Sequence, residues 1–311
     1  MVAEKLQYGD EIRVIAPSRS LTYVRKDILD NALAFLKLKG YRIRYSKNCH
    51  ETDTVSSSRI TSRVADLHEA FLDKNVKAVM PCIGGFNVNQ LLEYIDYSII
   101  ENNPKIICGF SDITALVNSI YAKTGLITYN GPMLCSFGFH NYLAYTNEMF
   151  EKCLLNNSPY RVIPSEQARE YLVIQDGICE GKVIGGNLCT LNLLQGTDFM
   201  PDLNDKVLFI EDDNIMGDYF VQEFERNLQS LLQVNGANRI RGLVFGRFDE
   251  SCKIDIETLS RIVLTKKQLV GIPIICNVDF GHIEPFITFP IGGKVKIVAR
   301  SKSVSIDMIV H

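Results

Sequence analysis

The sequence has no tryptophan, no long apolar run and no large excess of one charge. A membrane-spanning helix needs about 20 mostly apolar residues, so no span is expected. The formal net charge of −3 does not favour nucleic acid or an anionic membrane as a partner. The stretch from Met1 to Asp10 lacks the apolar core of a signal peptide. We therefore expect a cytoplasmic protein that binds neither nucleic acid nor membrane.

The nine cysteines include no Cys-x-x-Cys pair, and their number is odd. Zinc sites usually show paired spacings, and a disulfide framework usually has an even number of cysteines. Several of these cysteines lie within apolar runs, where reduced and buried thiols are the common case. We expect neither a disulfide framework nor a metal site, and the sequence indicates no other cofactor.

The chain has a length and composition that suit a folded protein of two domains. Of its 311 residues, 46% are hydrophobic and 22% are charged. This balance is typical of a globular protein with a sizeable core. A domain usually takes roughly 100–200 residues, so two domains are expected.

The first half alternates short apolar runs with amphipathic stretches. Predicted strands cover 11–16, 41–45, 76–81 and 106–109, and predicted helices cover 27–39, 63–72 and 90–94. This order indicates an α/β domain with a parallel sheet. Ligands bind such sheets beyond the carboxyl ends of the strands, so the turns after 81 and 109 are of interest.

The second half is richer in strand signals. Residues 140–172 are polar, and we interpret 141–175 as an irregular connecting segment. Short predicted strands follow, with one long predicted helix at 220–233. We expect an N-terminal α/β domain at 1–140 and a smaller, β-rich α+β domain at 176–311.

The turn after the fourth predicted strand carries a candidate nucleophile, Ser111. An apolar run ends at Gly109, and a helical pattern begins after Asp112. A serine on such a strand–turn–helix junction can attack a carbonyl, with helix N–H groups stabilising the oxyanion. The alternative is an ordinary N-cap serine. The match to a nucleophile elbow is partial, because Ile113 replaces the usual second glycine.

The turn after the third predicted strand contains Gly84 and Gly85. Its spacing matches neither a Walker loop nor a dinucleotide fingerprint. It is either a plain turn or a loop whose exposed N–H completes an oxyanion hole. The sequence supports these two interpretations equally at this point.

A serine nucleophile needs a base and a group that orients the base. Among the five histidines, His282 follows an apolar strand and a glycine, which suits a cleft. Glu211 ends the apolar run 207–210 and can orient an imidazole. Each also has a plain reading, as a solvated loop histidine and as one of a group of turn acids. Asp212 and Asp213 fit that second reading better than Glu211 does.

Taken in order, these segments resemble the serine LD-carboxypeptidase family, which includes the microcin C immunity peptidases. The motifs span nearly the whole chain, and the ordered set is specific although each motif is modest. They are Ala16-Pro17-Ser18, Gly84-Gly85-Phe86-Asn87, Gly109-Phe110-Ser111-Asp112, Tyr129-Asn130-Gly131-Pro132, Gly185-Gly186-Asn187, Ile210-Glu211-Asp212 and Gly281-His282.

The resemblance implies a flavodoxin-like (glutaminase-like) N-terminal domain and a smaller C-terminal β-rich domain. It implies a Ser-Glu-His triad in the chain order Ser111, Glu211, His282. It also implies an oxyanion hole formed by the backbone N–H groups of Gly85 and Asp112. A homodimer is implied as well.

The substrate is expected to be small and peptide-like. Residues 102–105 and 121–125 favour the microcin C immunity branch, whose substrates are peptidyl- or aminoacyl-nucleotides; the alternative is a murein tetrapeptide that loses its terminal D-alanine. In the immunity branch aromatic residues stack on the nucleotide, and Tyr160 or Tyr171 could take that place here. Arg19 or Arg247 could bind a substrate carboxylate.

Two readings compete with a serine peptidase. The first is a non-catalytic binding protein on the same scaffold, with Ser111 only a helix cap. The second is a cysteine hydrolase acting through Cys108 or Cys82, which lie near the two turns. Both cysteines sit in apolar strand-like sequence, where an inert core thiol is the commoner case.

Overall fold

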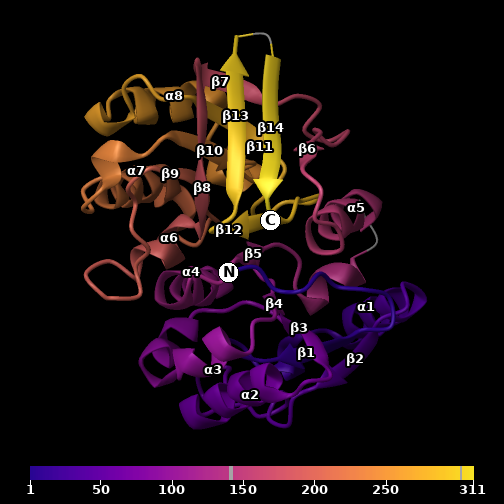
Figure 1. The fold of residues 1–311 in the computed structure, drawn as a ribbon. Helices are drawn as coiled ribbons and strands as arrows, with labels where there is room; N and C mark the ends of the chain where they lie inside the picture. Colours follow the sequence, from indigo (N-terminus) through magenta and orange to yellow (C-terminus); the bar gives the residue numbers. More distant parts are fainter. Residues whose placement is uncertain (140–142, 302) are drawn as a thin grey trace.

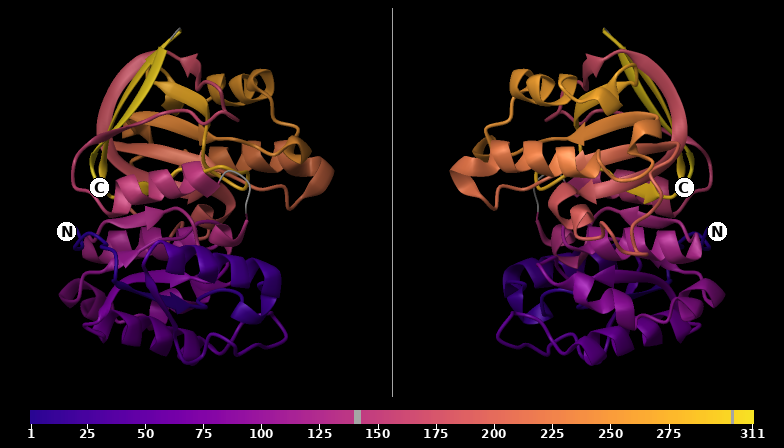
Figure 2. Two further views of the ribbon diagram at one scale, coloured as in Figure 1. Left: turned by 90° about the vertical axis from the view of Figure 1, so that its right-hand side faces the viewer. Right: turned by 90° about the vertical axis from the view of Figure 1, so that its left-hand side faces the viewer.

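The computed structural model describes residues 1–139, 143–301 and 303–311, and its two halves are stacked one on the other (Figure 1). The N-terminal half forms the lower body and the C-terminal half the upper one (Figures 1 and 2). The boundary expected between 140 and 141 lies outside the described residues. The predicted combination of a parallel-sheet N-terminal domain and a β-rich C-terminal region is confirmed.

The N-terminal sheet is parallel, with the strand order β2-β1-β3-β4. All five residues of β1 are buried, as expected for a central strand of a sheet covered on both faces. The strands are β1 (Glu11–Ile15), β2 (Arg42–Tyr45), β3 (Val76–Pro81) and β4 (Ile106–Ile107). The helices are α1 (Lys26–Leu38), α2 (Ile60–Leu72), α3 (Tyr97–Asn102) and α4 (Ile113–Thr124).

Two sequence predictions for local structure differ from the fold. The helix expected at 90–94 is a 3-10 helix, Val88–Tyr94. Part of the stretch expected to be irregular forms helix α5 (Leu143–Leu154), with strands β6 (Tyr160–Val162) and β7 (Leu172–Gln175) after it. The polar composition of this stretch hides a helical spacing, because Met149, Phe150 and Cys153 share one buried face of α5.

The C-terminal sheet has eight strands among the described residues, in the order β6-β14-β13-β8-β9-β10-β11-β7. The four strands from β8 to β11 are parallel, and the flanking strands run antiparallel. The strands are β8 (Gly177–Asn187), β9 (Lys206–Glu211), β10 (Gly242–Gly246), β11 (Ile274–Val278), β13 (Lys294–Arg300) and β14 (Ser303–Val310). The helices are α6 (Leu188–Asn192), α7 (Phe220–Leu231) and α8 (Ile256–Leu264).

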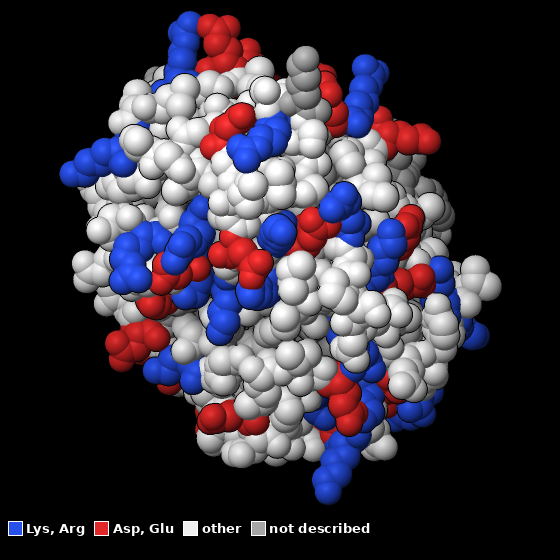
Figure 3. Space-filling model, turned by 45° about the horizontal axis from the view of Figure 1, so that its top comes forward, with Lys and Arg blue, Asp and Glu red and all other residues white. Residues whose placement is uncertain are grey.

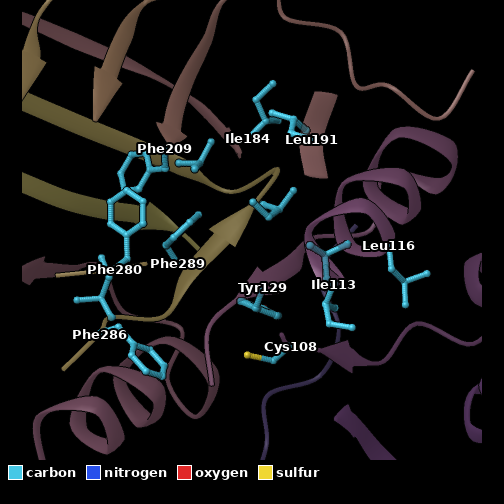
Figure 4. Packing of buried hydrophobic residues seen from close by; sticks show 14 of the residues in the cluster. Cys108, Ile113, Leu116, Tyr129, Ile184, Leu191, Phe209, Phe280, Phe286 and Phe289 are labelled. Carbon is cyan, nitrogen blue, oxygen red and sulfur yellow. The ribbon is translucent and has the colours of Figure 1, made fainter. Parts of the chain in front are cut away.

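The two halves share strand pairing and a common core. Strand β5 (Thr128–Asn130) pairs antiparallel with β12 (Phe289–Ile291), between the two bodies (Figure 1). Buried side chains of both halves, such as Ile113 from α4 and Phe209 from β9, face one interior (Figure 4). This continuous core fixes α4, which begins beside Ser111, against the C-terminal half.

Helix α4 approaches the end of β8 closely. Asn118 donates from Nδ2 to the carbonyl oxygen of Gly185 at 2.8 Å, and Thr114 Oγ1 accepts from the Asn187 N–H at 3.1 Å. Gly186 has a φ of 123°, and a Cβ there would lie 2.5 Å from Thr114 Oγ1. Glycine is therefore required at this contact, which aligns the carboxyl end of β8 with the Ser111 turn.

The described helices include none that is long and apolar enough to cross a membrane. On the face shown in Figure 3, basic and acidic side chains lie interleaved among the uncharged residues that make up most of the visible surface. This distribution agrees with the small net charge of the sequence.

Candidate active site

Ser111 lies between β4 and α4 with a left-handed backbone, at a φ of 61°. A non-glycine residue in this region carries strain of roughly 1–2 kcal/mol, which is typical of a nucleophile elbow. The N-cap residue of α4 is Asp112, and no side chain caps the helix. The interpretation of Ser111 as a capping serine is therefore wrong.

Ser111, His282 and Glu211 form a hydrogen-bonded row. His282 Nε2 lies 3.0 Å from Ser111 Oγ, and His282 Nδ1 lies 2.8 Å from Glu211 Oε2. A carboxylate only accepts hydrogen bonds, so it fixes the Nδ1–H tautomer of the neutral imidazole. The Nε2 lone pair then faces the serine hydroxyl, as a general base requires.

Each member of the row lies at the end of a strand. Glu211 is the last residue of β9 and is 1% exposed, whereas His282 follows β11 in a loop. A Cβ at Gly281 would lie 3.1 Å from Glu211 Oε2, so a glycine lets this loop pass close to the carboxylate. The sequence placed both residues at strand ends, and the fold brings the two ends together.

The electrostatics favour a charged imidazole. Burial opposes protonation, but the charge and hydrogen bond of Glu211, with the nearby Asp213 and Asp212, raise the pKa of His282 to about 9. Asp213 Oδ1 lies 3.9 Å from His282 Nε2. The site is therefore arranged to stabilise an imidazolium, the species formed when the base takes the serine proton.

Asp212 and Asp213 are joined by Asn187 at the end of β8. Asn187 Nδ2 donates to Asp212 Oδ1 and to Asp213 Oδ1, both at 3.0 Å. Burial, followed by the charges of Glu211 and Asp213, raises the pKa of Asp212 to about 8. Sequence reasoning gave Asn187 no role, although its position after two glycines at a strand end was a usable signal.

Asp112 contacts the glycine turn through its side chain. Its Oδ2 atom accepts from the backbone N–H groups of Asn87 and Val88, both at 2.9 Å, and from the Ser18 hydroxyl. Burial raises the pKa of Asp112 above its usual range, although these donors stabilise the carboxylate. Among the described residues, the N–H groups of Gly85 and Asp112 themselves have no protein acceptor.

Ser111 and His282 open onto a pocket of about 220 Å³. Gly85 and Asp112 also line it, so the structure brings the predicted oxyanion-hole residues to the same cavity. Sequence reasoning missed much of the remaining lining, because it depends on the docking of the two halves. Those lining residues are Phe86, Asn187, Cys189, Thr190, Leu193 and Ile215.

Arg19 and Arg247, the two candidates for binding a substrate carboxylate, differ in position. Arg19 lines the pocket, and its Nε donates to the Gly84 carbonyl at 3.0 Å. Arg247 is 8% exposed, bonds the Pro285 carbonyl and pairs with the buried Asp279 at 3.1 Å. It supports the loop that carries His282 and does not line the pocket.

The cysteine and tyrosine candidates lie away from the pocket. Cys108 and Cys82 are 1% and 0% exposed, and burial raises the pKa of both thiols well above the usual value. Neither lines the pocket, which argues against a cysteine nucleophile. Tyr160 donates to the Thr288 carbonyl at 3.2 Å, and Tyr171 to Asp279 at 3.1 Å. Neither tyrosine lines the pocket.

Within the described ranges, no group of three or more histidine, cysteine, aspartate or glutamate residues is placed to hold a metal ion. The three consecutive acids that begin with the last residue of β9 are instead hydrogen-bonded to His282 and Asn187.

Comparison with known families matches both halves of the chain. Residues 12–131 match the LD-carboxypeptidase N-terminal domain, and residues 180–297 match the LD-carboxypeptidase C-terminal domain. The two matches together cover more than half of the chain.

Three curated relatives match over nearly full length. YocD of Bacillus subtilis (strain 168), named as a carboxypeptidase, is 44% identical, covering 97% of this chain and 97% of its own. The microcin C7 self-immunity protein MccF of Escherichia coli is 34% identical, and the match covers 98% of this chain and 95% of MccF. A B. subtilis protein named as a murein peptide carboxypeptidase is 31% identical, covering 97% and 93%.

Solved structures of similar proteins also match over nearly the whole chain. An MccF-like protein from Bacillus anthracis str. Ames matches with a TM-score of 0.97 and 44% identity, covering 100% of both chains. MccF in complex with aspartyl sulfamoyl adenosine matches with a TM-score of 0.88 and 30% identity, covering 99% of this chain and 98% of its own.

Proposed function

Because the chain belongs to the LD-carboxypeptidase family and is a serine peptidase, we propose that it hydrolyses an amide bond through Ser111, His282 and Glu211. The observation that carries this proposal is the row of two hydrogen bonds, at 3.0 and 2.8 Å, that ends in the pocket. Nucleophile, base and orienting carboxylate then stand in the order that acyl transfer requires.

The chemistry follows from these positions. Ser111 Oγ attacks the scissile carbonyl while His282 Nε2 takes its proton. The N–H groups of Gly85 and Asp112 stabilise the oxyanion of the tetrahedral intermediate. His282 then protonates the leaving amine, and water hydrolyses the acyl-serine by the same route.

We propose an aminoacyl- or peptidyl-nucleotide as the substrate, with the murein tetrapeptide as the alternative. The first is supported by MccF structures that hold aspartyl sulfamoyl adenosine and glutamyl sulfamoyl guanosine. The alternative is supported by the relative named as a murein peptide carboxypeptidase. An assay with both substrates is therefore needed to decide between these two substrate classes.

The assay compares hydrolysis of aspartyl sulfamoyl adenosine with that of a murein tetrapeptide, using wild type and Ser111→Ala. We expect aspartyl sulfamoyl adenosine to be cleaved by wild type and not by Ser111→Ala, and the tetrapeptide to be cleaved by neither. Cleavage of the tetrapeptide alone would assign the chain to murein recycling. If wild type cleaves neither substrate, both proposed substrate classes are wrong.

The aromatic residue available to a nucleobase is Phe86. It lines the pocket and is 72% exposed. Its backbone is held beside the site, since the next two N–H groups bond Asp112. Leu193 and Ile215, 48% and 54% exposed, add apolar surface to the same pocket. We propose that this surface, rather than Tyr160 or Tyr171, contacts the nucleobase.

Phe86→Ala is expected to weaken binding of aspartyl sulfamoyl adenosine about tenfold, because stacking on a base contributes roughly 1–3 kcal/mol. Calorimetry in a Ser111→Ala background measures this without turnover. Leu72→Ala, at a 53% exposed apolar residue of α2 away from the pocket, is the control. Equal affinities in all three proteins would refute the Phe86 contact.

The rate is expected to rise with pH through the pKa of His282. A base must be neutral to take a proton, and this imidazole has a pKa of about 9. The kcat/KM profile should therefore have its ascending midpoint near pH 9 rather than near 6.5. The raised pKa also stabilises the folded state below about pH 6.5, and this contribution is lost as pH rises through 9. An ascending midpoint at or below 6.5 would contradict the assignment.

The homodimer and the cytoplasmic location stay predictions. Light scattering of the purified protein measures the first, and cell fractionation the second.

A further inference from the structure

Three loops at the carboxyl edge of the N-terminal sheet meet at one buried carboxylate. Asp112, which follows β4, is 2% exposed. It accepts from Asn87 and Val88 in the loop after β3, and from Ser18 in the loop after β1. All three bonds use the same oxygen, Oδ2. These loops come from distant parts of the sequence, and the Asp112 carboxylate joins all three of them through one atom.

The other end of the glycine turn is held by Arg19. The Gly84 carbonyl oxygen accepts from the Arg19 backbone N–H at 3.4 Å and from Arg19 Nε at 3.0 Å. The peptide between Gly84 and Gly85 is trans, so its N–H points opposite to its carbonyl. A carbonyl directed at Arg19 therefore directs the Gly85 N–H away from Arg19.

The opposite side of the glycine turn faces the nucleophile. A Cβ at Gly84 would lie 3.1 Å from Ser111 Oγ, so the backbone there passes directly beside the serine. A Cβ at Gly85 would lie 2.3 Å from Ser18 Oγ and 2.8 Å from Arg19 Cγ. A side chain at Gly85 would therefore displace Ser18 or Arg19, and one at Gly84 would crowd Ser111, because the loop is confined between Ser111 on one side and the β1 loop on the other.

From these contacts we infer that the Asp112 carboxylate and the Arg19 guanidinium are positioning groups that hold the Gly85 N–H in the direction of the developing oxyanion. This inference rests on the proposed function and assigns these side chains a role beyond lining the pocket. Asp112 acts twice, through its own N–H toward the oxyanion and through its carboxylate on the second donor. An oxyanion hole is effective when its donors are fixed before the reaction, so a loose loop loses rate more than substrate affinity.

The test compares Asp112→Ala, Asp112→Asn and Ser18→Ala with wild type. Asp112→Ala removes the oxygen that accepts from Asn87, Val88 and Ser18. It is expected to lower kcat about a hundredfold, with KM changed less than about threefold. Asp112→Asn keeps one amide oxygen for the Asn87 and Val88 N–H groups, so it should lose less. Ser18→Ala removes one of the three donors to Asp112 and should show the smallest loss of kcat.

A second measurement separates positioning from stability. A substrate analogue with a boronic acid in place of the scissile carbonyl forms a tetrahedral adduct with the serine, and its affinity should fall in proportion to kcat. Asp66→Ala is the matched control. Asp66 is a 5% exposed carboxylate that accepts the Asn48 backbone N–H at 3.1 Å, outside the pocket. That variant should melt at lower temperature and keep kcat.

The outcomes are distinct. A full kcat in folded Asp112→Ala, or a loss carried by KM alone, would overturn the positioning role. If Ser111→Ala keeps wild-type activity, the proposed catalytic mechanism itself fails. If Ser111→Ala is inactive while Asp112→Ala is fully active, only the positioning inference fails.

Discussion

Ser111→Ala is expected to lower kcat about a million-fold on whichever amide substrate the wild type cleaves. The hydroxyl is the only group of the row that forms a bond to the substrate, and serine peptidases lose rate on this scale without it. The substitution leaves the Cβ in place, so the strain of the left-handed backbone is unchanged. A steady-state assay together with a melting curve measures both effects.

A matched variant tests the strain itself. Ser111→Gly removes both the hydroxyl and the Cβ that resists a φ of 61°. It should be as inactive as Ser111→Ala and more stable, by about 1 kcal/mol. Substantial activity in either variant would refute the nucleophile, whereas equal stability of the two would refute only the strain.

Glu211→Gln is expected to lower kcat about 10⁴-fold. An amide that directs its NH₂ at His282 Nδ1 stabilises the wrong tautomer, with the proton on Nε2 facing Ser111. The opposite orientation places the NH₂ at the position of Glu211 Oε1, which is buried and has no hydrogen-bond partner. The NH₂ would then be a buried donor without an acceptor. Either orientation is therefore unfavourable. The variant should also lower the ascending midpoint of the pH profile, because Glu211 is the main group that raises the pKa of His282.

Glu11→Gln provides the control for this second variant. Glu11 is a 2% exposed carboxylate on β1 that pairs with Arg13 at 2.8 Å and does not line the pocket. It should lose stability and keep its rate. A Glu211→Gln protein with near wild-type kcat and an unchanged pH profile would contradict the role of the carboxylate.

The periodic elements of this fold could be predicted from the sequence, and the contacts between distant loops could not. The apolar run of β1 and the helical spacing of α1 are local signals, so both were predicted to within a residue or two. Strand ends were also predictable, which placed Ser111, Glu211 and His282 at plausible edges. Their mutual distances depend on the docking of the two halves, which no local pattern contains.

The failures have the same physical origin. Helix α5 was missed because it lies within a stretch whose overall composition is polar, and two of its six buried residues, Thr146 and Asn147, are themselves polar. Arg247 looked available for a substrate carboxylate, and tertiary packing instead pairs it with Asp279. The side-chain bonds of Asp112 join three loops that are separated by up to 94 positions, a separation that sequence spacing cannot reveal.

The most direct test of the account is covalent labelling with a fluorophosphonate, followed by mass spectrometry of the peptide that contains Ser111. We expect a single phosphonylated residue, Ser111, whose labelling is blocked by substrate and absent in Ser111→Ala. Labelling at another residue, or undiminished turnover by protein fully labelled at Ser111, would contradict it.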